Sequence, residues 1–352
     1  MRAMQKLGPV RRRAGLLVLG LAGAVGPASA AIEEVVVSTR RVEESLQSVP
    51  VAVTAFTSQE IEQIGLRDLQ DVSQFTPGLT YQNINGTLQL PVIRGLAQTN
   101  ITGAENNVAN FLNGIYLSNN RALDVALIDL ERVEVIKGPQ SALYGRNSFA
   151  GAISYVTAKP SDEFEAYVQG SLGGDELYDA KLSVSGPLVK DRLKGRVAVM
   201  TAGFDGNFTN QASSDNLQGY DGVGAYGALE WRITDAIGAD LFVYWADQDN
   251  EHPAQAFIPN NCGVSAFSTP TYLCGTVPVP STFSISPDAY GLDSQNAVVG
   301  LTLSWAISDA WTLKSLTGFS DSESNSLLDN DGTAGGVPFA ISGGGTVQTN
   351  AY

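Results

Sequence analysis

Beyond residue 164 the chain alternates apolar and polar residues in segments of about ten, and this pattern constrains the fold most. In one such segment, Phe164, Ala166 and Val168 alternate with Glu165 and Tyr167. Strands of this kind are typical of an outer-membrane β-barrel, although a soluble β-sandwich also alternates. We predict strands near 164–173, 177–186, 192–204, 222–233, 237–249, 295–306 and 311–322, with a further one starting near Thr346.

The connections between these strands separate the two alternatives. In chain order the six links are short, short, long, short, very long and short. Once the first link is assigned to the outside, the even links are the tight turns at 186–191, 234–237 and 308–310, and the third and fifth are the long loops at 205–221 and 250–294. Outer-membrane barrels have short periplasmic turns and longer external loops, whereas a sandwich has no reason to place its long loops at one end. The pattern therefore predicts transmembrane barrel strands whose tight turns face the periplasm.

Three tryptophans, Trp231, Trp305 and Trp311, lie close to the predicted short turns. Aromatic side chains form a girdle where a barrel meets the membrane interface. The alternative interpretation is that they belong to an ordinary sheet core.

Residues 1–30 have the three parts of a secretory signal peptide. A basic head that includes Arg2 and Lys6 precedes an apolar run at 14–25, and 28–30 forms a small-residue cleavage site. The apolar run is too short to cross a bilayer as a helix, which makes an uncleaved anchor the weaker alternative. We therefore expect export to the periplasm or to the outer membrane of a Gram-negative bacterium.

Charge and cysteine content narrow the class further. The predicted signal peptide carries five of the 21 basic residues and none of the 36 acidic residues. A chain left this acidic is not expected to bind nucleic acid through phosphates. Cys262 and Cys274 are the two cysteines, and in an exported chain they predict a disulfide, with two free thiols as the alternative.

Between residues 31 and 160 the pattern is mixed, which predicts a compact α+β domain. The expected helices are Ser58–Ile64, capped by Ser58, and 66–75, ended by the turn at 76–78; the expected strands include 51–56 and 132–136.

A short segment that favours a strand follows the predicted cleavage site. It consists of Glu33, Glu34, Val35, Val36, Val37, Ser38 and Thr39. Valines favour extended structure, and a polar, near-terminal location allows the segment to be mobile. A free strand can add to the edge of a partner's sheet, and a few backbone hydrogen bonds of about 1 kcal/mol net each suit a transient contact.

Six motifs, in order along the chain, resemble the plug domain of TonB-dependent receptors. They lie at 49–56, 71–79, 93–95, 130–139, 142–147 and 151–156. In this setting Glu33–Thr39 resembles the TonB box, the segment through which such receptors contact the energy-transducing protein TonB. The resemblance covers residues 33–160, and 184–189 is similar to the start of the family's barrel.

The resemblance implies an outer-membrane importer with a plug inside a barrel of roughly 22 strands. It divides the chain into a signal peptide (1–30), a TonB-box segment (31–48), a plug (49–160) and the N-terminal part of the barrel (161–352). The strands predicted here cannot close a barrel, so we expect a truncated product, a partial assembly or a fragment. We also expect no signalling extension before the box.

The resemblance also implies partners and cargo. The expected partners are TonB, with ExbB and ExbD acting through it, outer-membrane lipid, and a small-molecule ligand bound by the external loops. A ferric siderophore leads by its frequency in the family, and oligosaccharide, cobalamin, haem and aromatic compounds are alternatives. A passive porin or adhesin would lack the box and the plug motifs. A soluble secreted β-protein would remain in the periplasmic fraction after lysis instead of pelleting with the outer membrane.

Two positions are implied as a latch between plug and barrel. In the family, Arg94 and the residue at Lys137 pair with barrel carboxylates; a structural charge within the plug is the alternative for Arg94. The family usually has Arg where this chain has Lys137, and Lys gives a point charge rather than a fork, so we expect a looser latch. Asn113 stands where Asp is usual, which leaves the role of that position in doubt.

No catalytic residue, metal site or cofactor is predicted, and we do not expect an enzyme. His252 adjoins Glu251 in the long loop, and two ligands are too few for a metal site. We expect His252 to be a solvated loop residue.

Overall fold

The computed structural model describes residues 36–37, 44–84, 88–97, 107–117, 128–145, 147–256, 276, 280–329, 332, 334–335 and 338–351. The chain divides into two compact units, Met1–Glu34 and Val35–Tyr352. The predicted signal peptide and the cysteines Cys262 and Cys274 lie outside the described residues.

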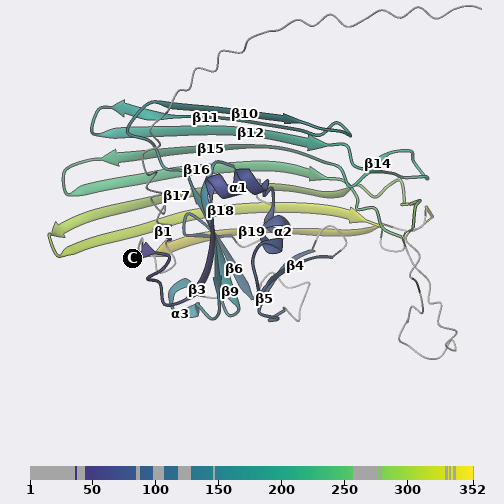
Figure 1. The fold of residues 1–352 in the computed structure, drawn as a ribbon, viewed down its shortest axis with the longest axis horizontal. Helices are drawn as coiled ribbons and strands as arrows, with labels where there is room; N and C mark the ends of the chain where they lie inside the picture. Colours follow the sequence, from purple (N-terminus) through teal and green to yellow (C-terminus); the bar gives the residue numbers. More distant parts are fainter. Residues whose placement is uncertain are drawn as a thin grey trace, which may run out of the picture. The chain divides into compact units, whose positions relative to one another are not determined.

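The N-terminal part, residues 44–157, is built around a five-stranded sheet in the order β3-β8-β9-β6-β7 (Figure 1). All neighbours in this sheet are antiparallel except β6 and β9. Its strands are β3 (Ala52–Thr57), β6 (Val108–Leu112), β7 (Ile115–Leu117), β8 (Leu130–Lys137) and β9 (Gly151–Thr157), with α1 (Ser58–Ile64), α2 (Leu69–Gln74), α3 (Ser141–Tyr144) and the hairpin β4 (Leu79–Ile84) and β5 (Leu88–Ile93) beside it.

The helix boundaries correct two details of the sequence prediction. Helix α1 is capped by Thr57 rather than Ser58, because Thr57 and Glu60 form a capping box: Oγ1 of Thr57 accepts from the Glu60 N–H, and the Glu60 carboxylate accepts from the Thr57 N–H. Helix α2 begins three residues later than predicted, because the side chain of Asp68 accepts from the Asp71 N–H and caps it there. Within the described residues, no helix is long and apolar enough to cross a membrane.

The C-terminal part forms an eight-stranded antiparallel sheet, here called the wall, in the order β10-β11-β12-β15-β16-β17-β18-β19. The strands are β10 (Glu165–Leu172), β11 (Tyr178–Val189), β12 (Leu193–Phe204), β15 (Tyr220–Arg232), β16 (Ile237–Asn250), β17 (Gly291–Ser308), β18 (Trp311–Leu328) and β19 (Phe339–Ala351). Each predicted strand is present, although β19 begins at Phe339, seven residues before the predicted start near Thr346. Strands β17 and β18 run several residues further toward the long loops than predicted, to Gly291 and Leu328.

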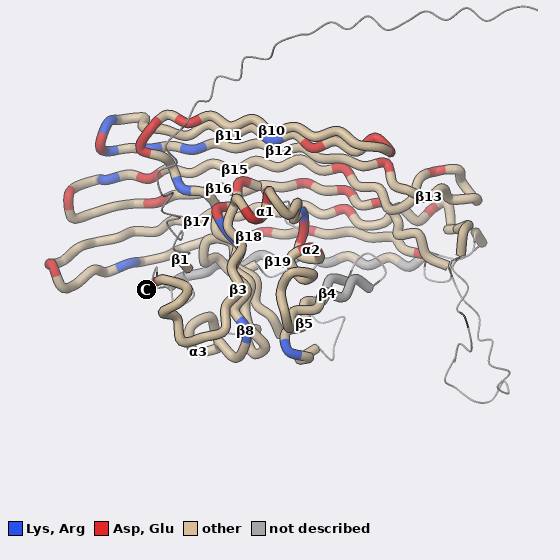
Figure 2. The backbone as a smooth tube through the Cα atoms, in the orientation of Figure 1, with Lys and Arg blue, Asp and Glu red and all other residues tan. Residues whose placement is uncertain are grey.

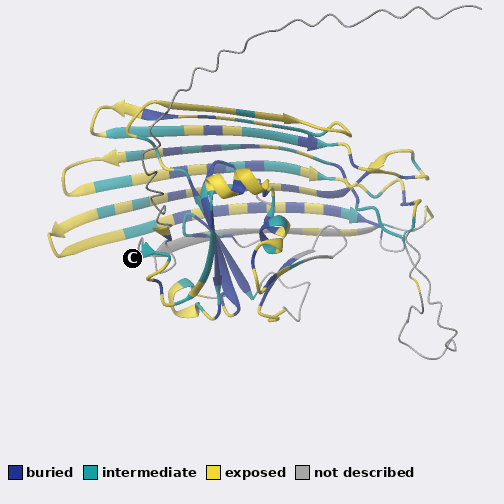
Figure 3. Cartoon of the chain, viewed as in Figure 1, coloured by how far each residue is buried: buried dark blue, intermediate teal, exposed yellow. Residues whose placement is uncertain are grey.

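The two faces of the wall differ along most of its length, as Figure 3 shows by the alternation of buried and exposed residues. The inner face carries buried aromatic residues such as Phe242 and Tyr244, whereas the outer face exposes apolar residues such as Val243 and Leu303. Trp231, Trp305 and Trp311 are also exposed on the outer face. The interpretation that these tryptophans form an ordinary sheet core is therefore wrong.

Charge separates the two ends of the wall (Figure 2). On the outer face near the long loops, Asp221, Asp249 and Asp293 lie directly opposite one another on β15, β16 and β17. From Val197 to Tyr352 the chain has only two basic residues, Arg232 and Lys314, and both lie near the short turns. The outer face is thus apolar nearer the short turns and acidic nearer the long loops.

The N-terminal part packs on the inner face of the wall. One hydrophobic cluster joins Val133 and Tyr155 of the N-terminal sheet to Tyr226 and Tyr244 of the wall. Glycine makes room for this contact: a Cβ added at Gly318 of β18 would lie 2.1 Å from Cδ1 of Ile115. The two parts therefore share a single apolar core.

Candidate functional site

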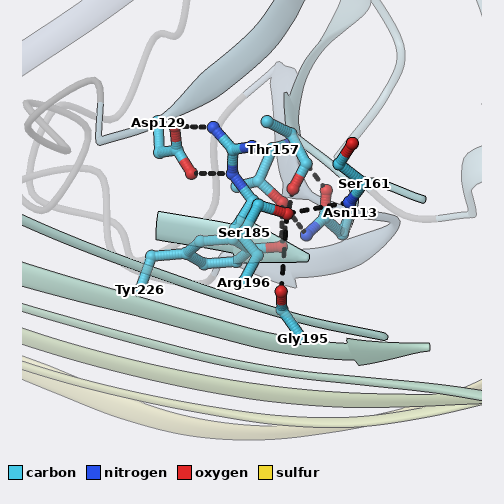
Figure 4. Close-up of polar contacts among 9 residues, drawn as sticks. Asn113, Asp129, Thr157, Ser161, Ser185, Gly195, Arg196 and Tyr226 are labelled. Carbon is cyan, nitrogen blue, oxygen red and sulfur yellow. Dashed lines mark hydrogen bonds and ion pairs between the residues drawn. The ribbon is translucent and has the colours of Figure 1, made fainter. Parts of the chain in front are cut away.

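A buried ion pair joins the N-terminal part to the wall (Figure 4). Arg196 of β12 donates from Nε and Nη2 to the two carboxylate oxygens of Asp129, at 2.5 and 2.7 Å. Asp129 directly precedes β8 in a left-handed conformation (φ 52°) and is buried, while Arg196 faces inward because it alternates with the outward Val197. A two-pronged pair in this position fixes both the distance and the orientation of the two parts.

A second polar contact runs from Asn113 to the wall through Thr157. Nδ2 of Asn113 donates to Oγ1 of Thr157 at 2.7 Å, and the Thr157 N–H donates back to Oδ1 of Asn113 at 3.0 Å. Oγ1 of Thr157 then donates to the hydroxyl of Tyr226 on β15 at 2.8 Å, and that hydroxyl donates to the Ala158 carbonyl at 3.3 Å. Because the relay begins at an amide donor, an ionised Asp at position 113 could not supply it.

The segment between β9 and β10, which links the N-terminal part to the wall, also makes polar contacts with the wall. The Ser161 N–H donates to Oγ of Ser185 on β11 at 2.8 Å (Figure 4). Nearby, Nζ of Lys194 lies 2.8 Å from the Glu230 carboxylate and 3.2 Å from that of Asp162. The chain is therefore fastened to the wall immediately before β10 begins.

The segment predicted as a free strand is partly paired. Val36 and Val37 form β1, which pairs antiparallel with β2 (Glu44–Ser45) through Val36↔Ser45 and Val37↔Glu44. Val37 is fully buried, whereas Val36 is 40% exposed. Glu33, Glu34, Val35, Ser38 and Thr39 lie outside the described residues. The described valines thus have a strand partner within the chain.

The implied latch residues Arg94 and Lys137 lie close together. Nζ of Lys137 donates to Oγ1 of Thr54 at 2.9 Å and to the Pro77 carbonyl at 3.2 Å. A Cβ added at Gly138 would lie 3.3 Å from Nη1 of Arg94. Burial, followed by the nearby charge of Arg94, lowers the pKa of Lys137. In the described part of the chain neither cation forms an ion pair with a carboxylate.

His252 is not solvated, which corrects the sequence prediction: only 2% of it is exposed. It lies where the loops at the far end of the wall pack together around Leu217, Phe283 and Ile285. The side chain of Asn210 accepts from the Ile285 N–H at 2.9 Å and donates to the Ile285 carbonyl at 3.0 Å. Loops without periodicity gave no sign of this small core in the sequence.

The Asp129–Arg196 pair was also missed. A charged residue on an inward position of a predicted strand was visible at Arg196, but nothing in the sequence marks a partner that lies 67 residues away. The sequence indicated part of the Asn113 relay, because position 113 has Asn where the family usually has Asp. It did not indicate the partners Thr157 and Tyr226.

Comparison with known proteins gives the same assignment for the N-terminal part. Residues 45–152 match the TonB-dependent Receptor Plug Domain. The chain is 28% identical over 209 residues to the pesticin receptor of Yersinia pestis, covering 58% of this chain and 30% of the relative. It is 25% identical over 273 residues to the ferrioxamine B receptor of Salmonella typhimurium, covering 75% of this chain and 36% of the relative.

Among solved structures, the ferric-catecholate import receptor Fiu from E. coli K12 has a similar fold, with a TM-score of 0.67 at 19% identity over 87% of this chain and 46% of that one. The chain thus spans about a third of the length of the curated relatives it matches, 30% and 36% for the two named above. These relatives are receptors.

An α+β plug seated on the inner face of antiparallel barrel strands defines a class of outer-membrane protein. Within that class, residues 45–152 are similar to the plug domain of the TonB-dependent receptors, and the relatives named above are receptors. The fold class inferred from the sequence is confirmed.

Proposed function

We propose that this chain belongs to a TonB-dependent importer of a ferric siderophore. The observation that carries the proposal is the plug match at 45–152 together with the packing of that plug on the inner face of the wall. Two comparisons support an iron chelate as cargo. One relative is a ferrioxamine B receptor, and one solved structure with a similar fold is a ferric-catecholate import receptor. Oligosaccharide, cobalamin, haem and aromatic compounds remain the competing cargoes.

In the proposed mechanism, ligand binds the external loops and shifts the plug toward a state in which Glu33–Thr39 is available to the periplasm. TonB then pairs with this segment as an added strand, and ExbB and ExbD supply energy through TonB. The pairing of Val36 and Val37 with Glu44–Ser45 supports the choice of segment, because it demonstrates that these residues take up strand geometry. TonB must displace β2 or use the opposite edge of β1.

The domain limits belong to the same proposal: a signal peptide at 1–30, a box segment at 31–48, a plug at 49–160 and barrel strands from 161 onward. A disulfide between Cys262 and Cys274 would tie the longest external loop. Outer-membrane lipid is the proposed partner of the exposed apolar residues on the outer face of the wall.

Arg94 and Lys137 are proposed as the plug side of a latch. Two neighbouring cations repel each other, which favours a carboxylate partner on the barrel. The bonds of Lys137 to Thr54 and Pro77 are compatible with this role, since an ammonium has three donors and these contacts use two. We expect Lys137→Gln to weaken plug retention and Thr54→Val, which removes only an internal partner, to leave it unchanged.

The box is tested by binding a peptide of residues 31–45 to the C-terminal domain of TonB. Val36→Pro removes a strand donor and is expected to abolish binding, whereas Val36→Ala keeps the donor and is expected to bind. Equal binding by the Pro peptide and the unsubstituted peptide would rule out strand pairing.

The cargo class is tested by the abundance of the protein in outer membranes from iron-starved and iron-replete cells. A clear rise on starvation is expected of an iron-chelate importer. No change would contradict an iron cargo and direct the same comparison to glycans and aromatic compounds.

A further inference from the structure

Three loops meet around His252 at the far end of the wall, and His252 is the one histidine of the chain. The segment after β16 contains His252 itself. The loop after β12 reaches it through the Gln218 N–H, which donates to the His252 carbonyl at 3.0 Å. The segment after β18 reaches it through Asp329.

The hydrogen bonds of the imidazole define its protonation state. Nδ1 lies 2.8 Å from the Pro253 carbonyl, which can only accept, so Nδ1 carries the proton. Nε2 lies 2.9 Å from the backbone nitrogen of Asp329, whose N–H can only donate, so Nε2 is bare. Both ring nitrogens are satisfied by a neutral ring, and the ring is buried.

Asp329 connects this ring to further segments. Its carboxylate accepts from the Ser286 N–H at 2.8 Å and from the Gly332 N–H at 2.9 Å, and its carbonyl accepts from the Gln255 amide. Asp329 is itself buried. The bond from its N–H to His252 therefore ties the segment after β18 directly to the segment after β16.

We propose that neutral His252 is a positioning residue whose Nε2 holds these loops in one arrangement through the Asp329 N–H. If Nε2 were protonated, its N–H would face the Asp329 N–H, and the hydrogen bond between them would be lost. The segment after β18 would then be released. The inference rests on the proposed function only in assigning ligand capture to these loops. The contact between His252 and Asp329 does not depend on any cargo.

Two carboxylates are the charged groups near His252 among the described residues. That of Asp329 favours the protonated ring, but both of its oxygens already accept backbone N–H groups. That of Glu251 is turned to the Gly219 N–H at 3.0 Å. Burial is the larger effect and lowers the pKa of His252. The folded loops thus bind fewer protons than unfolded ones, so they lose stability as the pH falls below about 6.5.

The test compares two substitutions in the full receptor in whole cells, at equal abundance in the outer membrane. His252→Phe keeps a ring of similar size but removes both nitrogens. His252→Gln keeps an acceptor that reaches the Asp329 N–H and cannot be protonated. Chymotrypsin is the probe, because the loops offer Phe208, Phe283 and Tyr290.

At pH 7.5 we expect His252→Phe to be cut in these loops about tenfold faster than the unsubstituted receptor, the effect of losing roughly one buried hydrogen bond. His252→Gln is expected to be cut at the unsubstituted rate. Equal cleavage of the Phe variant and the unsubstituted receptor would overturn the proposal. Fast cleavage of both variants would also overturn it, since ring packing and not the acceptor would then hold the loops.

A second measurement reads the ring directly. The two ring-nitrogen NMR signals of His252 in the detergent-solubilised, labelled receptor are assigned as those that disappear in His252→Gln. We expect the Nδ1–H tautomer and a pKa below 6.5, unchanged in Glu251→Gln. An ordinary titration near 6.5 would contradict the proposal. Neither measurement uses cargo. If the receptor bound no iron chelate but gave the expected cleavage and NMR results, the proposed function would be wrong and the role of His252 would stand.

Discussion

The plug and the segment before it are held in different ways. Where the plug meets the barrel strands, a buried two-pronged ion pair between Asp129 and Arg196 is reinforced by the relay from Thr157 to Tyr226. In the segment that precedes the plug, β1 is held by two residue pairs with β2. The chain is thus held by a two-pronged ion pair where the plug meets the wall, and by two residue pairs in the segment proposed to bind TonB.

The largest expected effect comes from breaking the ion pair. Asp129→Ala leaves Arg196 buried without its partner, and we expect a loss of about 3 kcal/mol of stability. Lys194→Gln is the matched control, because its pairs with Glu230 and Asp162 are more exposed and should contribute less than about 1 kcal/mol. Thermal unfolding of the purified receptor measures both. Equal effects would show that burial of the Asp129–Arg196 pair has no special role.

A somewhat smaller loss of stability is expected at Gly318, the glycine of the wall that contacts the plug. Gly318→Ala would place a Cβ against Ile115, and overpacking of this kind costs about 1–3 kcal/mol. Gly227→Ala is the control, since a Cβ added at Gly227 would lie 4.0 Å from the nearest atom, the Arg196 carbonyl oxygen. Unfolding should separate the two substitutions. A Gly318 variant as stable as the Gly227 variant would argue against close packing of plug and wall.

Loss of one hydrogen bond of the relay from Asn113 to Tyr226 should reduce stability by less than either change above. Tyr226→Phe removes the hydroxyl between Thr157 and Ala158 and is expected to cost about 1 kcal/mol. Tyr178→Phe removes a hydroxyl that donates to exposed Asp221 on the outer face, where solvent can replace the partner. The difference between these two variants, measured by urea unfolding, reports the contribution of the plug contact.

The smallest change in stability is expected at the pair of strands β1 and β2. Ser45→Pro removes a strand N–H from β2 and should alter global stability by only a few tenths of a kcal/mol, because β1 and β2 lie outside the main sheets. It should raise the affinity of a TonB C-terminal domain about fivefold, since one competing backbone bond is lost. Ser45→Ala keeps the N–H and is expected to leave affinity unchanged. Lower affinity in the Pro variant would mean that β2 assists TonB.

The sequence predicted regular elements better than contacts between them. The wall strands followed from alternation and the plug from its motifs, because both signals are local. The Asp129–Arg196 pair depends on how the plug is seated, which no local pattern encodes. The burial of His252 depends on three loops meeting, and the cap at Thr57 rather than Ser58 depends on the reciprocal bond from Glu60.

Uptake of radioactive iron, supplied as a ferric siderophore to cells producing the receptor, tests the central claim most directly. Unsubstituted receptor, Val36→Ala and Val36→Pro are compared in cells with and without TonB, and surface binding is measured in parallel. The account predicts that Val36→Pro binds the chelate but imports none, as does unsubstituted receptor without TonB. Import by the Pro variant at the unsubstituted rate would contradict the account.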